Sequence, residues 1–88
     1  MEHESHPGIV KRLQRANGHL TSVIAMIEAG RPCVDLAQQL HAVEAAITNA
    51  KRALIHDHID HCLAEGIGSA QGAPDAALKE FRTLAKYL

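Results

Sequence analysis

Residues 33–64 decide the fold of this protein, and they read CVDLAQQLHAVEAAITNAKRALIHDHIDHCLA. Apolar residues recur there in steps of three and four, namely Leu36, Leu40, Val43, Ile47, Ala50 and Leu54. This spacing predicts one amphipathic helix over about 33–64. Such a helix is roughly 45 Å long at 1.5 Å per residue, which is more than a small monomer can cover. We therefore expect it to assemble into a helix bundle.

The same periodicity predicts two further helices and an all-α, three-helix protomer. A helix over about 7–29 has its apolar residues at Ile9, Leu13, Ala16, Leu20, Val23 and Ile27. Gly30 is expected to end it, and Gly18 is interpreted as a point of close approach by another helix. A third helix is expected over about 74–88, after a Gly-rich loop. Residues 1–6 are expected to be a flexible arm, and residues 1–88 form a single domain.

The composition limits the classes of protein that the chain can belong to. It has 88 residues, of which 47% are hydrophobic, with one Phe, one Tyr and no Trp. A chain this short has a marginal core unless it oligomerises. No run approaches the roughly 20 apolar residues of a membrane span, and the N-terminus has no signal-peptide pattern. We expect a cytoplasmic protein without membrane association, in which two cysteines indicate metal binding or reactivity before a disulfide.

Three residues form the candidate metal site: Cys33, His58 and Cys62. His58 and Cys62 are four residues apart and so share one helix face. Two thiolates and an imidazole suit Cu(I), and they are acceptable to Ni(II), Co(II) or, in vitro, Zn(II). Cys33 and Cys62 would lie roughly 43 Å apart along one helix, so a shared metal needs Cys33 from an antiparallel second protomer. The alternative is that both cysteines are small buried hydrophobic residues.

The other histidines allow two interpretations. His56 and His61 lie beside Asp57 and Asp60, so they are either surface residues or groups that orient a ligand. On the N-terminal arm, His3 and His6 are additional candidate ligands, because the arm could fold over the site; otherwise they belong to a solvated tail.

The basic residues are a candidate DNA surface. The net charge of −1 gives no argument for nucleic acid, but residues 5–27 contain no acid. The candidates are Lys11, Arg12, Arg15, Lys51 and Arg52. A symmetric oligomer would multiply their phosphate contacts, whereas the alternative is an ordinary solvated face. There is no helix-turn-helix, zinc-finger or catalytic motif, so we expect no enzyme and no catalytic residues.

Several segments together resemble the CsoR/RcnR family of metal- and formaldehyde-responsive repressors. They are RLQRANGHL at 12–20, the turn at Cys33, QQLHAV at 38–43 and HIDHC at 58–62. The resemblance implies an antiparallel four-helix-bundle dimer, a dimer of dimers, and copper-ligand roles for Cys33, His58 and Cys62. It also implies operator binding without a helix-turn-helix, and release of DNA when metal binds.

Departures from the family pattern leave the inducer open. Pro32 stands where copper sensors often have a tyrosine, and nickel and cobalt sensors recruit an N-terminal histidine, a part that His3 or His6 could play. Formaldehyde sensors pair the first cysteine with an N-terminal proline, whereas Glu2 follows Met1 here. Our interpretation is a homotetrameric repressor that senses Cu(I), with Ni(II) or Co(II) as the alternative. Formaldehyde sensing and a metal-storage protein that never binds DNA are further alternatives.

Overall fold

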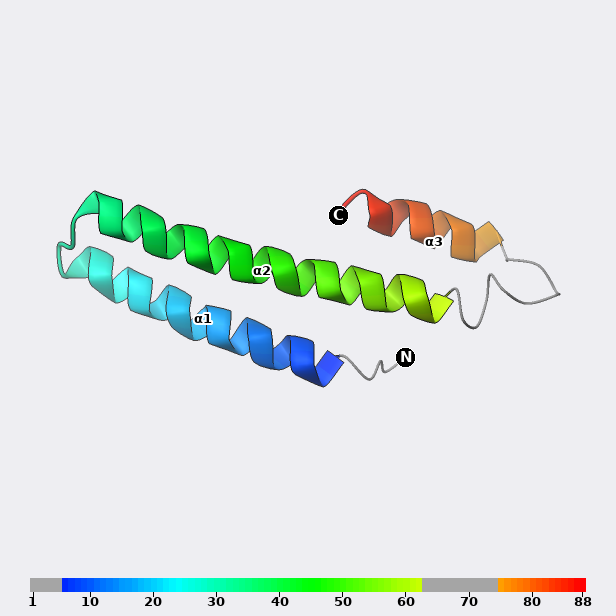
Figure 1. The fold of residues 1–88 in the computed structure, drawn as a ribbon, viewed down its shortest axis with the longest axis horizontal. Coiled ribbons are helices and arrows are strands. Elements are labelled where there is room, and N and C mark those ends of the chain that lie inside the picture. Colours follow the sequence, from blue (N-terminus) through cyan, green and yellow to red (C-terminus); the bar gives the residue numbers. More distant parts are fainter. Residues whose placement is uncertain (1–5, 63–74) are drawn as a thin grey trace.

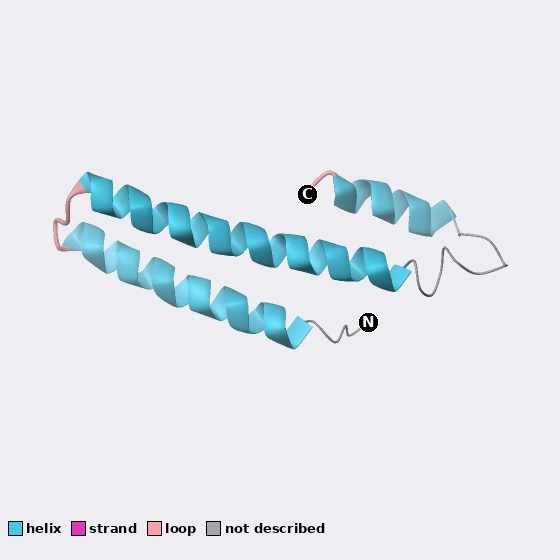
Figure 2. Cartoon of the chain, viewed as in Figure 1, coloured by secondary structure: helices cyan, strands magenta, loops and turns pink. Residues whose placement is uncertain are grey.

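The computed structural model describes residues 6–62 and 75–88, which form three α-helices (Figure 1). Helix α1 spans His6–Glu28, α2 spans Cys33–Cys62, and α3 spans Asp75–Ala85. Within these described ranges there is no strand (Figure 2), which confirms the predicted all-α class. Helices α1 and α2 pack as an antiparallel hairpin, and α3 packs on the far side of α2 (Figure 1).

The turn between α1 and α2 closes as the sequence predicts. Gly30 has a φ of 77°, a left-handed conformation that glycine adopts without steric cost. The N–H of Arg31 donates to the carbonyl of Met26 at 3.1 Å, and the N–H of Gly30 donates to that of Ile27 at 3.0 Å. These two bonds are the Schellman arrangement, which satisfies the last carbonyls of a helix. The chain then reverses within four residues, so α2 returns along α1.

The core of the hairpin is a seam of small residues at a spacing of seven. Ile9, Ala16 and Val23 are buried on α1, and Val43 and Ala50 are buried on α2. Residues seven apart return to nearly the same side of a helix, so both sets face each other along the hairpin. Because the seam is built from Ala and Val, the two helices can approach closely. The remaining surface of each helix faces away from the α1–α2 contact.

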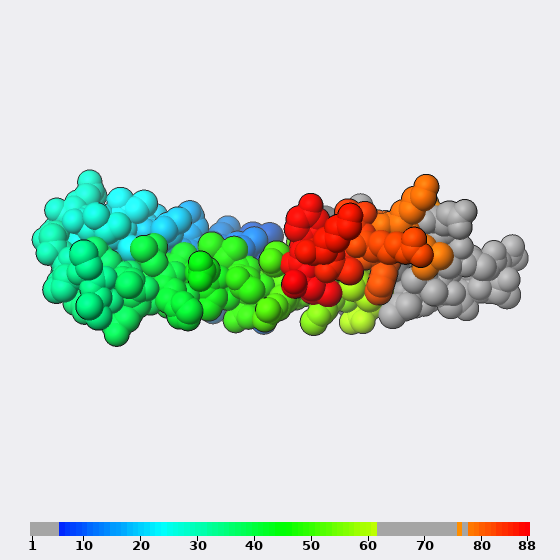
Figure 3. All heavy atoms as spheres, turned by 90° about the horizontal axis from the view of Figure 1, so that it is seen from above, coloured from blue at the N-terminus to red at the C-terminus, as the bar shows by residue number. Residues whose placement is uncertain are grey.

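A second packing contact joins α2 to α3. Ile55 is 3% exposed, yet it lies about 140° around α2 from Ala50 at 100° per residue. That direction points away from α1, toward the side on which α3 packs (Figure 1). Seen from above, α3 covers the second half of α2 (Figure 3).

One side of the hairpin leaves a row of large apolar side chains uncovered, which we call the apolar face. Its members are between 36 and 51% exposed, and they are Leu13, Leu20, Ile24, Ile27, Leu40, Ile47 and Leu54. On each helix they lie next to the core seam and on the same side of it, because residues at these spacings differ by 100° per step. Such a row of seven in one protomer matches the expectation that these helices bury their faces against other helices.

The helix ends differ slightly from the predicted ranges. The predicted arm over 1–6 already ends at His6, which is the first residue of α1, and residues 1–5 lie outside the described part. For the predicted ranges 33–64 and 74–88, α2 is described to Cys62 and α3 from Asp75. The expectation that the last helix reaches residue 88 is wrong: α3 ends at Ala85, and the N–H groups of residues 86–88 bond to carbonyls three residues back.

Two further expectations have a structural outcome. No heavy atom lies within 4 Å of the position that a Cβ would take at Gly18, so within the described part of one protomer Gly18 does not mark a close approach. None of the described helices is both long enough and apolar enough to cross a membrane.

Candidate metal site and DNA-facing groove

The candidate metal ligand His58 lies near the end of α2, where α3 packs against it. Its Nε2 atom is 2.8 Å from Oε1 of Glu80 on α3, and the two side chains are 29% and 53% exposed. A carboxylate at this distance fixes the orientation of an imidazole ring and engages one of its two nitrogens. The Glu80 carboxylate thus lies next to the candidate ligand and ties it to α3. The sequence analysis did not find Glu80, because it is 22 residues from His58 and belongs to another helix.

Cys33 is the first residue of α2, and its thiol is free and exposed. The turn around it is held by the N–H of Leu36, which donates to the carbonyl of Pro32 at 3.1 Å. Arg31 and Asp35 flank the cysteine with a 3.6 Å ion pair, in which both side chains are about half exposed. An exposed pair of this kind contributes little stability. Cys33 thus lies at the turn end of the hairpin and is accessible to another molecule.

The structure separates Cys33 from the other predicted ligands. Helix α2 runs without a break from Cys33 to Cys62, so 25 residues of helix, or roughly 38 Å, lie between Cys33 and His58. Cys62 is the last residue of α2, one turn after His58. Among the side chains that the structure describes, no three His, Cys, Asp or Glu groups gather closely enough to hold a metal ion. One protomer cannot bring Cys33 to His58.

Three further histidines, His6, His56 and His61, belong to the same end of the hairpin as His58. Because the helices are antiparallel, the start of α1 points toward the end of α2, and α2 extends beyond it (Figure 1). His6 and His61 are half-buried and His56 is exposed. His3 lies outside the described residues.

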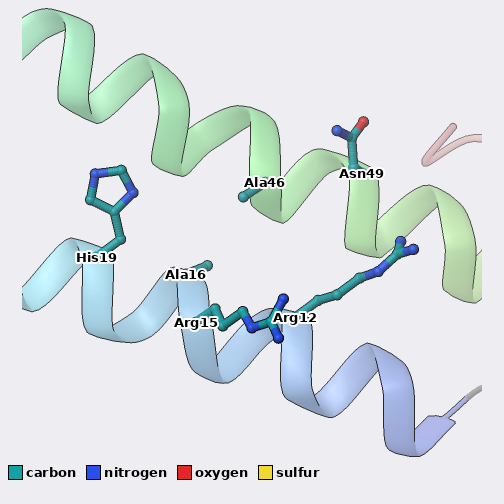
Figure 4. Close-up of a pocket in the computed structure, with 6 residues that line it drawn as sticks. All are labelled: Arg12, Arg15, Ala16, His19, Ala46 and Asn49. Carbon is teal, nitrogen blue, oxygen red and sulfur yellow. The ribbon is translucent and has the colours of Figure 1, made fainter.

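A groove opens between α1 and α2 on the side opposite the apolar face (Figure 4). It has a volume of about 490 Å³, and its walls are Arg12, Arg15, Ala16, His19, Ala46 and Asn49. The side chain of Arg12 extends from α1 toward α2, and the ring of His19 also points toward α2 (Figure 4). His19 Nε2 and Gln39 Oε1 are 2.6 Å apart, a hydrogen bond that links the two helices.

Of the five predicted DNA-binding residues, the groove brings two together. Arg12 and Arg15 both line it. Lys11, Lys51 and Arg52 are exposed but do not line it. Around α2, Lys51 lies about 200° from the groove residue Asn49 and faces away from it, whereas Arg52 lies only about 60° from Asn49, at the edge of the groove side. The basic residues therefore form more than one surface on a single protomer.

A helical hairpin alone does not identify a protein family, so the family is assigned from the sequence of the whole chain. The family described as metal-sensitive transcriptional repressors matches residues 5–87. The chain belongs to this family. Its members are repressors and not enzymes. This explains why the sequence contains no catalytic motif.

Three relatives of the chain are named copper-sensing transcriptional repressors. The copper-sensing transcriptional repressor CsoR of Bacillus subtilis is 41% identical over 64 residues, which are 73% of this chain and 63% of that protein. CsoR of Mycobacterium ulcerans is 33% identical over 78 residues, 89% of this chain and 65% of that protein. The copper-sensing repressor RicR of Mycobacterium tuberculosis is 33% identical over 66 residues, 75% of this chain and 67% of that protein.

The chain spans just under two thirds of the length of both CsoR relatives. No solved structure matches it significantly. Membership of the repressor family thus rests on sequence, and the site residues rest on the geometry described above.

Proposed function

We propose that this member of the repressor family is a cytoplasmic, copper-responsive transcriptional repressor. It binds operator DNA in the metal-free form and releases it when Cu(I) binds. The proposal is supported by the family match over residues 5–87 and by relatives that are named copper-sensing repressors. The observation on which it depends most is the unbroken helix α2, which holds a thiol at its first residue and a His–Cys pair at its last turn.

The proposed copper site lies between protomers. Cys33 of one protomer joins His58 and Cys62 of an antiparallel partner, because the helical separation of roughly 38 Å excludes a site within one chain. Two thiolates and one imidazole form a soft donor set, which Cu(I) prefers. His58 fits this role, because Oε1 of Glu80 lies 2.8 Å from its Nε2 atom and can orient the imidazole ring. The metal supplies a bond between protomers that neither chain makes alone.

The apolar face is the proposed surface of dimerisation. Pairing two hairpins through it produces an antiparallel four-helix bundle, and a dimer of dimers then gives the homotetramer. In this assembly the proposed DNA contacts are Lys11, Arg12, Arg15, Lys51 and Arg52. Since no described helix pair has a helix-turn-helix arrangement, binding depends on phosphate contacts summed over protomers.

Release of DNA requires a difference in affinity between two states. Copper must bind the DNA-free arrangement more tightly than the DNA-bound one, and by linkage the same factor weakens DNA binding. A factor of about 100 corresponds to about 2.7 kcal/mol, which lies in the ordinary range of such coupling energies. Because Glu80 contacts His58, the end of α2 and helix α3 are the parts through which the coupling would pass.

The test is fluorescence anisotropy of the metal-free protein on DNA from its own promoter region. The complex is titrated anaerobically with Cu(I) and, separately, with Ni(II). We expect one Cu(I) per protomer to dissolve the complex at a lower free concentration than Ni(II). If the metal-free protein does not bind DNA at low salt, the repressor function is excluded and metal storage remains. Binding that neither metal reverses would point to another inducer, with formaldehyde the first to try.

Nickel or cobalt sensing is the second candidate function. It is favoured by His6, which is half-buried at the start of α1, at the same end of the hairpin as the part of α2 that contains His58. An added histidine nitrogen, from His6 or His3, would raise the donor number to four, as Ni(II) requires. The His6→Ala variant separates the two candidates, because it should weaken Ni(II) binding and leave Cu(I) binding unchanged.

A further inference from the structure

The groove between α1 and α2 contains two guanidinium groups without an acidic partner. Neither Arg12 nor Arg15 makes an ion pair with a carboxylate in the part of the chain that the structure describes. Residues 6–27 of α1 contain no acid at all. A guanidinium presents a planar set of N–H donors that matches the oxygens of phosphate. The groove is therefore positively charged and lacks an internal counterion.

Two further polar side chains line the same groove. Nε2 of His19 donates to Oε1 of Gln39 at 2.6 Å, which fixes the orientation of the ring. Nδ1 can donate to a phosphate oxygen only in the imidazolium form, in which both ring nitrogens carry a hydrogen. Asn49 enters from α2 and offers a carboxamide N–H₂ donor. Between them, Ala16 and Ala46 are small residues, which leaves the volume of about 490 Å³ open.

The groove stays accessible when two hairpins pair through the apolar face. Around α1, Arg12 and His19 lie on one side of the buried Ala16, whereas Leu13 and Leu20 of the apolar face lie on the other. Pairing through the apolar face thus leaves this side of the hairpin uncovered.

We propose that Arg12, Arg15, His19 and Asn49 form a single binding site for a phosphate group. The arginines supply the charge, while His19 and Asn49 position the phosphate by hydrogen bonds from both helices. If the bound group is a backbone phosphate of operator DNA, the inference rests on the proposed function. Asn49 and His19 are then DNA-positioning residues, and α2 contributes to the same phosphate contact as α1. Free inorganic phosphate shares this chemistry and is distinguished by experiment.

The first measurement uses inorganic phosphate and no DNA. The full-length protein is titrated with potassium phosphate, and separately with potassium chloride at equal ionic strength, while NMR follows the His19 ring and the Asn49 side-chain amide. Phosphate should shift both signals saturably, and chloride should not. Shifts that are equal in the two salts, or that do not saturate, would overturn the proposal. This result does not depend on whether the protein binds DNA.

The matched variants are Asn49→Asp and Gln38→Glu. Both turn a carboxamide into a carboxylate on α2, but Gln38 is exposed and lies outside the groove, eleven residues or roughly 16 Å of helix from Asn49. Asn49→Asp should weaken phosphate binding at least about fivefold, because a carboxylate beside two guanidiniums repels the phosphate. Gln38→Glu should leave it unchanged. Equal effects of the two variants would contradict a localised site.

Operator binding then identifies the occupant. If the repressor function is correct and the occupant is DNA, Asn49→Asp and His19→Ala weaken operator binding several-fold, whereas His41→Ala, an exposed histidine outside the groove, does not. Arg12→Ala should also reduce the salt dependence of log Kd by about one unit. If phosphate binds but the operator affinity of Asn49→Asp is unchanged, the site serves free phosphate and the DNA surface lies elsewhere. Circular dichroism of each variant confirms that the helices are intact.

Discussion

Nε2 of His58 and Oε1 of Glu80 lie 2.8 Å apart and join the end of α2 to α3. The contact makes the candidate metal ligand part of the packing of α3. A movement of the imidazole ring therefore alters the packing of α3, and a movement of α3 alters the position of the ring. A metal site built on His58 thus has a mechanical connection to a second helix.

Replacing Glu80 by Ala should weaken Cu(I) binding without removing a ligand. Loss of a carboxylate that orients a metal-bound histidine typically reduces metal affinity about 10- to 100-fold. The measurement is an anaerobic competition titration against a chromophoric Cu(I) chelator. Glu44→Ala is the control, because Glu44 is an exposed carboxylate in the middle of α2. Equal affinity of the Glu80 variant and the wild type would show that the contact has no role in metal binding.

Replacing Cys33 by Ala should abolish induction and preserve DNA binding. The thiol is exposed at the first residue of α2 and packs in no core, so its removal should cost less than about 0.5 kcal/mol of stability. The operator complex of this variant should form with wild-type affinity in the anisotropy assay and resist stoichiometric Cu(I). Loss of operator affinity in the metal-free variant would instead mean that Cys33 has a structural role.

The helices of this protein were predictable because their signals are local. The three- and four-residue spacing of apolar side chains predicts α1 and α2, and Gly30 predicts the turn between them. The end of α3 was less predictable, since apolar Leu88 continues the helical pattern although the helix ends at Ala85. The N–H groups of residues 86–88 donate to carbonyls three residues back instead of four. No residue in this segment signals the change.

The site was predictable only where its residues share one helix. His58 and Cys62 could be paired from a spacing of four, and the length of α2 separates Cys33 from both. Glu80 could not be found in this way, because its contact with His58 crosses residues 63–74, whose composition indicates only a loop. The groove was missed for the same reason: Asn49 and Arg12 meet through the register of the hairpin, which the two separate helix patterns do not specify.

The two glycines Gly30 and Gly18 should respond in opposite directions to the same substitution. Gly30→Ala should destabilise the protein by about 1–2 kcal/mol, because alanine is strained at a φ of 77°. Gly18→Ala should stabilise it by up to about 1 kcal/mol, since Gly18 lies inside α1 with no neighbour within 4 Å of the new Cβ. Urea unfolding at one fixed protein concentration measures both. A destabilised Gly18 variant would indicate that a second protomer packs against that position.

Replacing Ile47 by Glu should prevent association through the apolar face. Ile47 is 45% exposed in one protomer and lies in the middle of the row along α2, so pairing of the face would bury the new carboxylate without a partner. Such a buried charge typically costs about 3–5 kcal/mol, which raises the dissociation constant of a dimer by at least about 100-fold. Sedimentation velocity at several concentrations should show the wild type as an oligomer and the variant as a smaller species.

The control for that experiment is His41→Glu, which places the same carboxylate about 120° around α2 from Ile47. His41 is exposed and lies about 180° around the helix from the core seam, so this variant should keep the wild-type mass. Circular dichroism at the same concentrations shows whether separated protomers keep their helices. A wild-type mass for Ile47→Glu would exclude the apolar face as the interface, and the shared site of Cys33 and His58 would then need a different pairing of chains.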